Sequence, residues 1–267
     1  MGRRRAAAAV VAAIAVVFTI VAATQVRFDP FFIDPKWEGT PLPPCFVDAS
    51  KCYGHVLGSD EVGRDLLARL VFGGMVSLLV PLIAVAVEVM LGAGIAISAR
   101  AGPYFGFVVR RFEAAISCFP PWAFVIAMIA IGAQRSPTLP LFVLAVLMGL
   151  VFSPRIARLA RSEHGKRGAL AASLDQAVYD LTRLIILLAT LDFSRLGTQP
   201  PTASWGSMLT NLPENIGIAW WAAVFPALAL FSAVLVIEIL RRLLFDSATH
   251  AVSDAGLSFA NVSASRS

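Results

Sequence analysis

The sequence predicts an all-α fold, a polytopic bundle of transmembrane helices. The first observation is the composition: of 267 residues, 58% are hydrophobic and only 15% are charged, and the mean hydropathy is +0.76. In a soluble domain about 25% of the residues are charged. The second observation is that the apolar residues form runs close to the ~20 residues needed to cross a bilayer. Because backbone polar groups must pair within such a run, we expect helices, and the alternating pattern of barrel strands is absent.

Six apolar runs supply about six predicted spans. The first follows three arginines and is expected to be an uncleaved anchor, with a cleaved signal peptide as the alternative. The third contains Pro120 and Pro121, the fourth is expected to end near Ser153 and Pro154, and the fifth is too short to cross alone. The runs are Ala6–Thr24, Met75–Ala99, Phe112–Ala133, Leu139–Phe152, Leu181–Phe193 and Trp220–Leu240.

The basic residues predict the orientation of the spans. The net charge is +5, and most arginines stand in clusters at the ends of apolar runs. With six spans all of these clusters fall on one side, which the positive-inside rule assigns to the cytoplasm, so both termini are expected there. No basic face alternates with aromatic residues, so no nucleic-acid partner is expected. The clustered residues are Arg3, Arg4, Arg5, Arg100, Arg110, Arg111, Arg155, Arg158, Arg161, Lys166, Arg167, Arg183, Arg241 and Arg242.

Three regions follow from this topology. Residues 1–70 are expected to form an N-terminal anchor span and an extracytoplasmic loop, and residues 71–245 the transmembrane domain. Residues 246–267 are small and polar, so the sequence predicts a disordered cytoplasmic tail there.

The outer loop holds two cysteines, Cys45 and Cys52. If it faces an oxidising compartment, a loop-closing disulfide is expected, with two unpaired thiols as the alternative. His55 lies close in sequence, but no convincing fourth ligand completes a zinc site, so no metal site is predicted. The chain has no phosphate-binding loop, because Gly165-Lys-Arg167 lacks the first glycine and the hydroxyl. We therefore expect no cofactor and no enzyme activity.

Charged residues inside the apolar runs are candidate functional residues, because a carboxylate in a span is costly unless it is paired or wet. Glu88 lies in the middle of the second run, where it either lines a translocation path or makes a hydrogen bond within the bundle. Glu238 precedes Arg241 and Arg242 and is expected to pair with a neighbouring arginine. Glu113 is expected to form an ion pair at the membrane interface.

Two polar blocks carry a resemblance to a known family. His55-Val-Leu-Gly-Ser-Asp-Glu-Val-Gly-Arg-Asp65 resembles the His-x-Leu-Gly-Thr-Asp-x-x-Gly-Arg-Asp block of C-type permease subunits of dipeptide, oligopeptide and nickel ABC importers. Gln199-Pro-Pro-Thr-Ala-Ser-Trp-Gly-Ser-Met-Leu209 resembles their Gln-Pro-Pro-x-x-Ser-Trp-Gly-x-Met-Leu outer segment. The resemblance runs from about His55 to Leu240 in the same order and includes Phe119-Pro120 and Phe225-Pro226.

The resemblance implies a type I ABC importer permease fold and a place in the bacterial cytoplasmic (inner) membrane. The implied function is that of a permease subunit moving peptides inward by ATP-driven alternating access. It implies a second permease subunit, ATP-binding subunits, an extracytoplasmic substrate-binding protein and membrane lipid as partners. ATP hydrolysis then belongs to a separate subunit. Glu88, Pro120 and Trp205 are the candidates for the translocation path.

The chain departs from the family where the ATPase-coupling loop is expected. Leu170-Ala171-Ala172-Ser173 resembles the family's Leu-Gly-Ala-Ser, and only Glu163, farther upstream, offers a glutamate. The fifth span is also shortened, so it is short, tilted, or partly built from residues 175–188. Two alternative functions therefore stay open: a remnant that assembles without coupling, and a secondary carrier that uses Glu88. The lack of an internal repeat speaks against the carrier.

Overall fold

The computed structural model describes residues 40–99, 102–117, 141–161, 165–210 and 217–264, together with 10, 29–30, 32–33, 120, 123 and 125–127. This part of the chain is helical and contains no strand, which confirms the all-α prediction. By length and composition, three helices are able to cross a membrane: α2 (Leu66–Ser98), α5 (Leu141–Ala160) and residues Trp220–Phe245 of α9 (Trp220–Ala264). They correspond to the second, fourth and sixth predicted spans.

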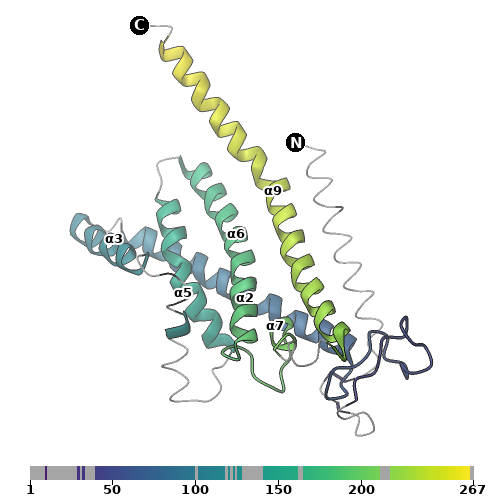
Figure 1. The fold of residues 1–267 in the computed structure, drawn as a ribbon. Coiled ribbons are helices and arrows are strands. Elements are labelled where there is room, and N and C mark those ends of the chain that lie inside the picture. The colour runs from purple at the N-terminus through teal and green to yellow at the C-terminus, as the bar shows by residue number, and fades with distance from the viewer. Residues whose placement is uncertain are drawn as a thin grey trace.

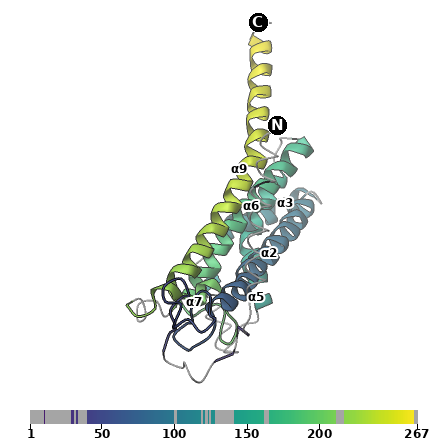
Figure 2. The same cartoon turned by 90° about the vertical axis from the view of Figure 1, so that its right-hand side faces the viewer.

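The remaining helices complete the described fold. α3 (Pro103–Ser117) includes the beginning of the third predicted span, α6 (Gly165–Phe193) contains the fifth, and α7 (Trp205–Met208) is a single turn. The first predicted span, apart from Val10, lies outside the described residues, as does most of the third. In Figures 1 and 2, α7 and the loop before α2 lie at one end of the bundle, and α9 extends beyond the other end.

α2 begins nine residues before the predicted span because Asp65 caps it. The Asp65 Oδ2 accepts a hydrogen bond of 2.7 Å from the backbone N–H of Ala68, which satisfies one of the free donors of the first turn. Leu66 and Leu67 then continue the apolar pattern and are buried. The polar block therefore ends directly in the helix, without an intervening linker.

α5 corrects the prediction that the fourth span ends near Ser153 and Pro154, because the helix continues to Ala160. Proline removes one backbone donor, but both residues are buried and Ser153 Oγ donates to the Leu150 carbonyl at 2.8 Å. α5 packs most extensively against α2. At Gly92 of α2, an added Cβ would lie 2.7 Å from the Cβ of Ile156, so the absence of a side chain permits the close helix contact.

α6 is one continuous helix of 29 residues where the sequence predicts a polar loop followed by a short span. In the structure residues 175–188 are thus helical and continuous with the predicted fifth span. Helix formation satisfies the backbone hydrogen-bonding groups of the polar half within the helix itself. Its charged residues remain compatible with packing because they pair with arginines of α5 and α9.

The packed core lies between α2, α5 and α6, and α9 packs on α6 (Figure 1). Residues 246–264 continue α9 as a helix, whereas the sequence predicts disorder there. No proline follows Pro226 in the sequence, so every residue of this stretch retains the backbone N–H that a continuing helix needs. Residues of the core are Val80, Ala84, Val125, Leu144, Ala145, Met148, Val151, Phe152, Leu184, Leu188 and Leu191.

Candidate functional site

The first polar block folds into a compact turn held by Asp60. Its Oδ1 accepts hydrogen bonds from the backbone N–H groups of Val62 (3.0 Å) and Arg64 (2.9 Å), and its Oδ2 accepts one from Arg64 Nε (2.8 Å). The Nδ1 of His55 lies 2.7 Å from Asp65 Oδ1. The two acidic residues therefore have local structural roles: one closes the turn and the other starts α2.

The second polar block is held by Asp192, which is buried near the end of α6. Asp192 Oδ1 accepts from the Thr198 backbone N–H and Oδ2 from the Ser204 hydroxyl, both at 2.5 Å. Ser204 also caps α7, in a reciprocal arrangement with Ser207. Asp192 was not predicted as a site residue. The sequence feature that could have indicated its role is its position just before the Arg195–Gly197 turn.

Trp205 joins the second block to α2, which begins directly after the first block. Its backbone N–H donates to Ser77 Oγ at 2.9 Å, and its indole Nε1 donates to the Leu70 carbonyl at 2.8 Å. The ring covers Gly74, where an added Cβ would lie 2.8 Å from a ring carbon. Trp205 thus packs α7 onto the first half of α2, and only 8% of it is exposed.

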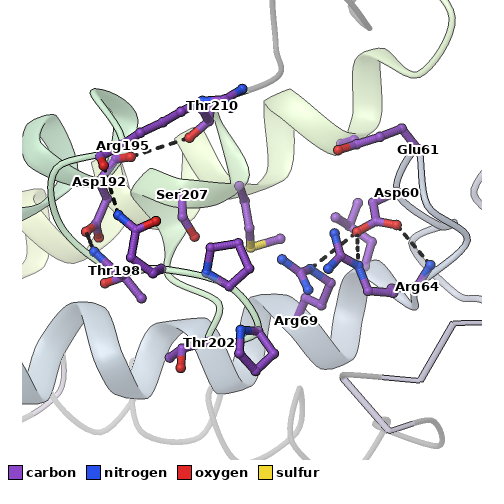
Figure 3. Close-up of a pocket in the computed structure, with 16 residues that line it drawn as sticks. Asp60, Glu61, Arg64, Arg69, Asp192, Arg195, Thr198, Thr202, Ser207 and Thr210 are labelled. Atoms are coloured by element: carbon purple, nitrogen blue, oxygen red, sulfur yellow. Dashed lines mark hydrogen bonds and ion pairs between the residues drawn. The ribbon is translucent and has the colours of Figure 1, made fainter. Parts of the chain in front are cut away.

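Between these two blocks lies a pocket of about 300 Å³ (Figure 3). Its charged lining consists of three acidic residues and three arginines, and prolines 200 and 201 form part of its wall. Arg69, one turn into α2, has a side chain that is only 8% exposed, and its Nε lies 3.4 Å from Asp60 Oδ2. The charged residues are Asp60, Glu61, Asp192, Arg64, Arg69 and Arg195.

Glu88 lies far from this pocket, in the other half of α2, and is completely buried. Neither of its oxygens has a hydrogen-bond partner of good geometry among the described residues. It interacts with Asp180 of α6, which accepts from Arg155 Nη1 at 3.0 Å and from Gln176 Nε2 at 2.7 Å. Among the described residues, Arg155 therefore donates its hydrogen bond to Asp180 and not to Glu88.

Ion pairs connect the helices near the end opposite the pocket. Arg241 of α9 donates to Asp175 of α6 at 2.7 Å and also to Glu238, which Arg242 contacts as well. Glu238 therefore pairs with neighbouring arginines, as predicted. Glu113 of α3 accepts hydrogen bonds from both η-nitrogens of Arg161. Arg161 lies 48 residues away in sequence, so the spacing of the sequence did not indicate this partner.

The predicted coupling residues lie in the first half of α6, except Glu163, which lies outside the described residues. Leu170 and Leu174 are separated by one helical turn and are 61% and 46% exposed. Pro120, a candidate for the translocation path, is exposed, and its immediate neighbours lie outside the described residues. The structure therefore does not bring Glu88, Pro120 and Trp205 together in the pocket, whose lining contains none of the three.

The loop before α2 contains a disulfide between Cys45 and Cys52, with Cα atoms 4.9 Å apart. The bonded segment precedes the Asp60 turn, and the Cys45 backbone N–H donates to the Val56 carbonyl at 3.2 Å. The disulfide therefore constrains the segment that leads into the Asp60 turn.

No family model matches the sequence. Among curated proteins, a putative peptide transport system permease protein of Brucella suis is 29% identical over 212 residues, covering 70% of this chain and 70% of the relative. The di/tripeptide transport system permease protein DppC of Pseudomonas aeruginosa is 29% identical over 234 residues (77% and 75%). The oligopeptide transport system permease protein OppC of Haemophilus influenzae is 28% identical over 249 residues (82% and 77%).

Proposed function

We propose, from its homology to the permease proteins of peptide ABC transport systems, that this chain is a transmembrane permease subunit of a binding-protein-dependent importer for di- or oligopeptides in a bacterial cytoplasmic membrane. The observation that carries the proposal is the similarity to peptide permeases over 70–82% of the chain. The two polar blocks that carry the resemblance in sequence support it, because they fold around one pocket at one end of the bundle.

The proposed transport is alternating access of a path shared with a second permease subunit. Only 11% of the apolar window of α9 and 33% of that of α2 is buried within the chain. These helices therefore present apolar faces to lipid and to a neighbouring subunit. The proposed energy source for the change in access is ATP bound by a partner subunit.

The proposed contact with the ATP-binding subunit is the first half of α6. Leu170 and Leu174 lie one turn apart and are exposed, and the positive-inside rule predicts a cytoplasmic location for this part of the chain. Apolar side chains next to charged ones are suited to a groove on a soluble partner. Residues 170–173 resemble the family segment that couples to the ATPase.

The test is purification of the tagged full-length chain from its own bacterium under mild solubilisation. A co-purifying ATPase whose hydrolysis responds to a binding protein and peptide supports the proposal. Leu170→Ala should weaken ATPase association roughly fivefold or more, the loss expected if Leu170 is one of the minority of interface residues that carry the binding energy. Leu228→Ala on α9 is the matched control, because Leu228 is 55% exposed on a lipid-facing helix. An assembled complex that never responds to peptide would instead identify a non-coupling remnant.

Glu88 is the observation that favours a second candidate, a secondary carrier. The Glu88 carboxylate is buried and makes no hydrogen bond of good geometry within the described residues, and a carboxylate in such a position is suited to take up and release a cation. Uptake driven by a pH gradient in vesicles that contain the purified chain alone, and abolished by Glu88→Gln, would identify the carrier. Dependence of uptake on ATP and on partner subunits would exclude it.

A further inference from the structure

Arg69 is a buried arginine whose hydrogen-bonding capacity is not used within the described residues. Its Nε and Nη1 are buried without a hydrogen-bond partner, and the residue lines the outer pocket. A buried guanidinium without acceptors is costly, so such groups are normally paired with an anion. The unsatisfied donors therefore indicate that an acceptor from outside the chain completes this site.

Asp60 does not supply that acceptor. Its Oδ1 is taken by two backbone N–H groups, and its Oδ2 is held at 2.8 Å by Arg64 Nε. The separation of 3.4 Å between Asp60 Oδ2 and Arg69 Nε is an ion pair without a formed hydrogen bond. Asp60 thus reduces the net charge around Arg69 but leaves its donors available.

A second unsatisfied group faces the same pocket. The Thr198 hydroxyl is buried and makes no hydrogen bond of good geometry in the described part of the chain, although the Asp192 carboxylate lies close to it, and Thr198 lines the pocket across from Arg69 (Figure 3). Asp192 beside it accepts hydrogen bonds on both oxygens, from Thr198 and Ser204. A guanidinium and a hydroxyl are a suitable pair of donors for a carboxylate.

The size and charge of the pocket restrict the ligand. A volume of about 300 Å³ lies at the lower end of ligand pockets, so it accommodates a dipeptide or the terminal residue of a longer peptide. The lining carries as many acidic residues as arginines. A zwitterion, with one carboxylate and one ammonium group, matches such a lining better than a dianion does.

We propose that this pocket binds the C-terminal carboxylate of a peptide on the outer side of the bundle, with Arg69 donating to the carboxylate and Thr198 as a second donor. The identification of the ligand as a peptide depends on the proposed transport function; the carboxylate chemistry depends only on the pocket. The same chemistry is available from an acidic side chain of a partner protein, and the experiment separates the two sources.

The test is equilibrium binding to the full-length chain in detergent, followed by intrinsic tryptophan fluorescence, since Trp205 bonds to the residue after Arg69. The probes are alanyl-alanine and its C-terminal amide, which lacks the carboxylate charge. The unmodified chain should bind the free dipeptide at least about tenfold more tightly than the amide, as expected for a charge-assisted hydrogen bond. Arg69→Gln should abolish this difference, and Arg69→Lys should retain part of it.

Arg242→Gln is the matched control, because it removes one arginine from the opposite end of the molecule, where the side chain is 66% exposed. It should keep the preference for the free dipeptide. Each variant is compared by thermal unfolding, and Thr198→Val provides a second change in the pocket that leaves all charges in place. It should weaken the free dipeptide about two- to tenfold, the effect of one hydrogen bond.

Equal binding of the two probes by the unmodified chain overturns the proposal, and so does a preference that survives in well-folded Arg69→Gln. If neither probe binds but Arg69→Gln releases a co-purified binding protein, the carboxylate comes from the partner and the peptide assignment is wrong. Binding with the expected preference but no transport in the assembled complex leaves the site standing and rejects the proposed function.

Discussion

The close contact of α2 with α5 leads to a quantitative prediction at Gly92. In Gly92→Ala the new methyl group would lie 2.7 Å from Ile156 Cβ and 2.9 Å from the Ser153 carbonyl oxygen. Both neighbours are buried in α5, so relief requires the two helices to separate. Overpacking of this kind typically costs about 1–3 kcal/mol.

Gly94 of the same helix provides the control, because an added Cβ there has no atom within 4 Å. Both substitutions gain the same helix propensity, about 1 kcal/mol for alanine over glycine. The difference between the two variants therefore isolates the steric term. We expect Gly92→Ala to be less stable than Gly94→Ala by about 1–3 kcal/mol.

The measurement is the free energy of unfolding in mixed detergent micelles titrated with a denaturing detergent, followed by circular dichroism. Both variants should retain the helix content of the unmodified chain. If Gly92→Ala is as stable as Gly94→Ala, then α2 and α5 do not approach each other at this position, and the packing of the core described above is wrong.

Three further predictions concern the outer end and the topology. Asp65→Ala removes the cap of α2 and the partner of His55, so the free energy of unfolding should fall by about 1–2 kcal/mol; Asp65→Asn should lose less, and equal loss would argue against the cap. Reduction of the disulfide between cysteines seven apart in sequence should lower stability by about 2–3 kcal/mol, measured as a lower Tm that Cys45→Ser reproduces. In intact cells, an impermeant thiol reagent should label Ser50→Cys and spare Lys166→Cys; the reverse pattern would overturn the orientation.

The sequence was sufficient for the helical class and for three spans, because long apolar runs have few alternatives in lipid. It also contained the signal for the true start of α2, since Asp65 directly before Leu66 is a capping residue. The continuity of α5 through Pro154 was not predictable from local pattern, because it depends on burial of Ser153 and Pro154 against α2.

The candidate site was predicted only in its parts. The two polar blocks were recognised, but their meeting depends on contacts such as the hydrogen bond from Trp205 to Leu70, 135 residues apart in sequence. The role of Arg69 follows from what surrounds it, and neither the burial nor the missing partners are visible in the sequence. Likewise, the polar residues of α6 favour a loop when only the sequence is considered. The structure shows that Asp180 pairs with Arg155 and Asp175 with Arg241.

The continuity of α6 has a mechanical consequence. From Ala169 to Phe193 the helix contains neither proline nor glycine, so it has no weak point at which bending is concentrated. At 1.5 Å per residue its 29 residues form a stiff rod about 44 Å long. If α6 couples to a partner at Leu170, as proposed, a displacement there would tilt the helix as one unit and move Asp192, which holds Thr198 and Ser204 beside the pocket.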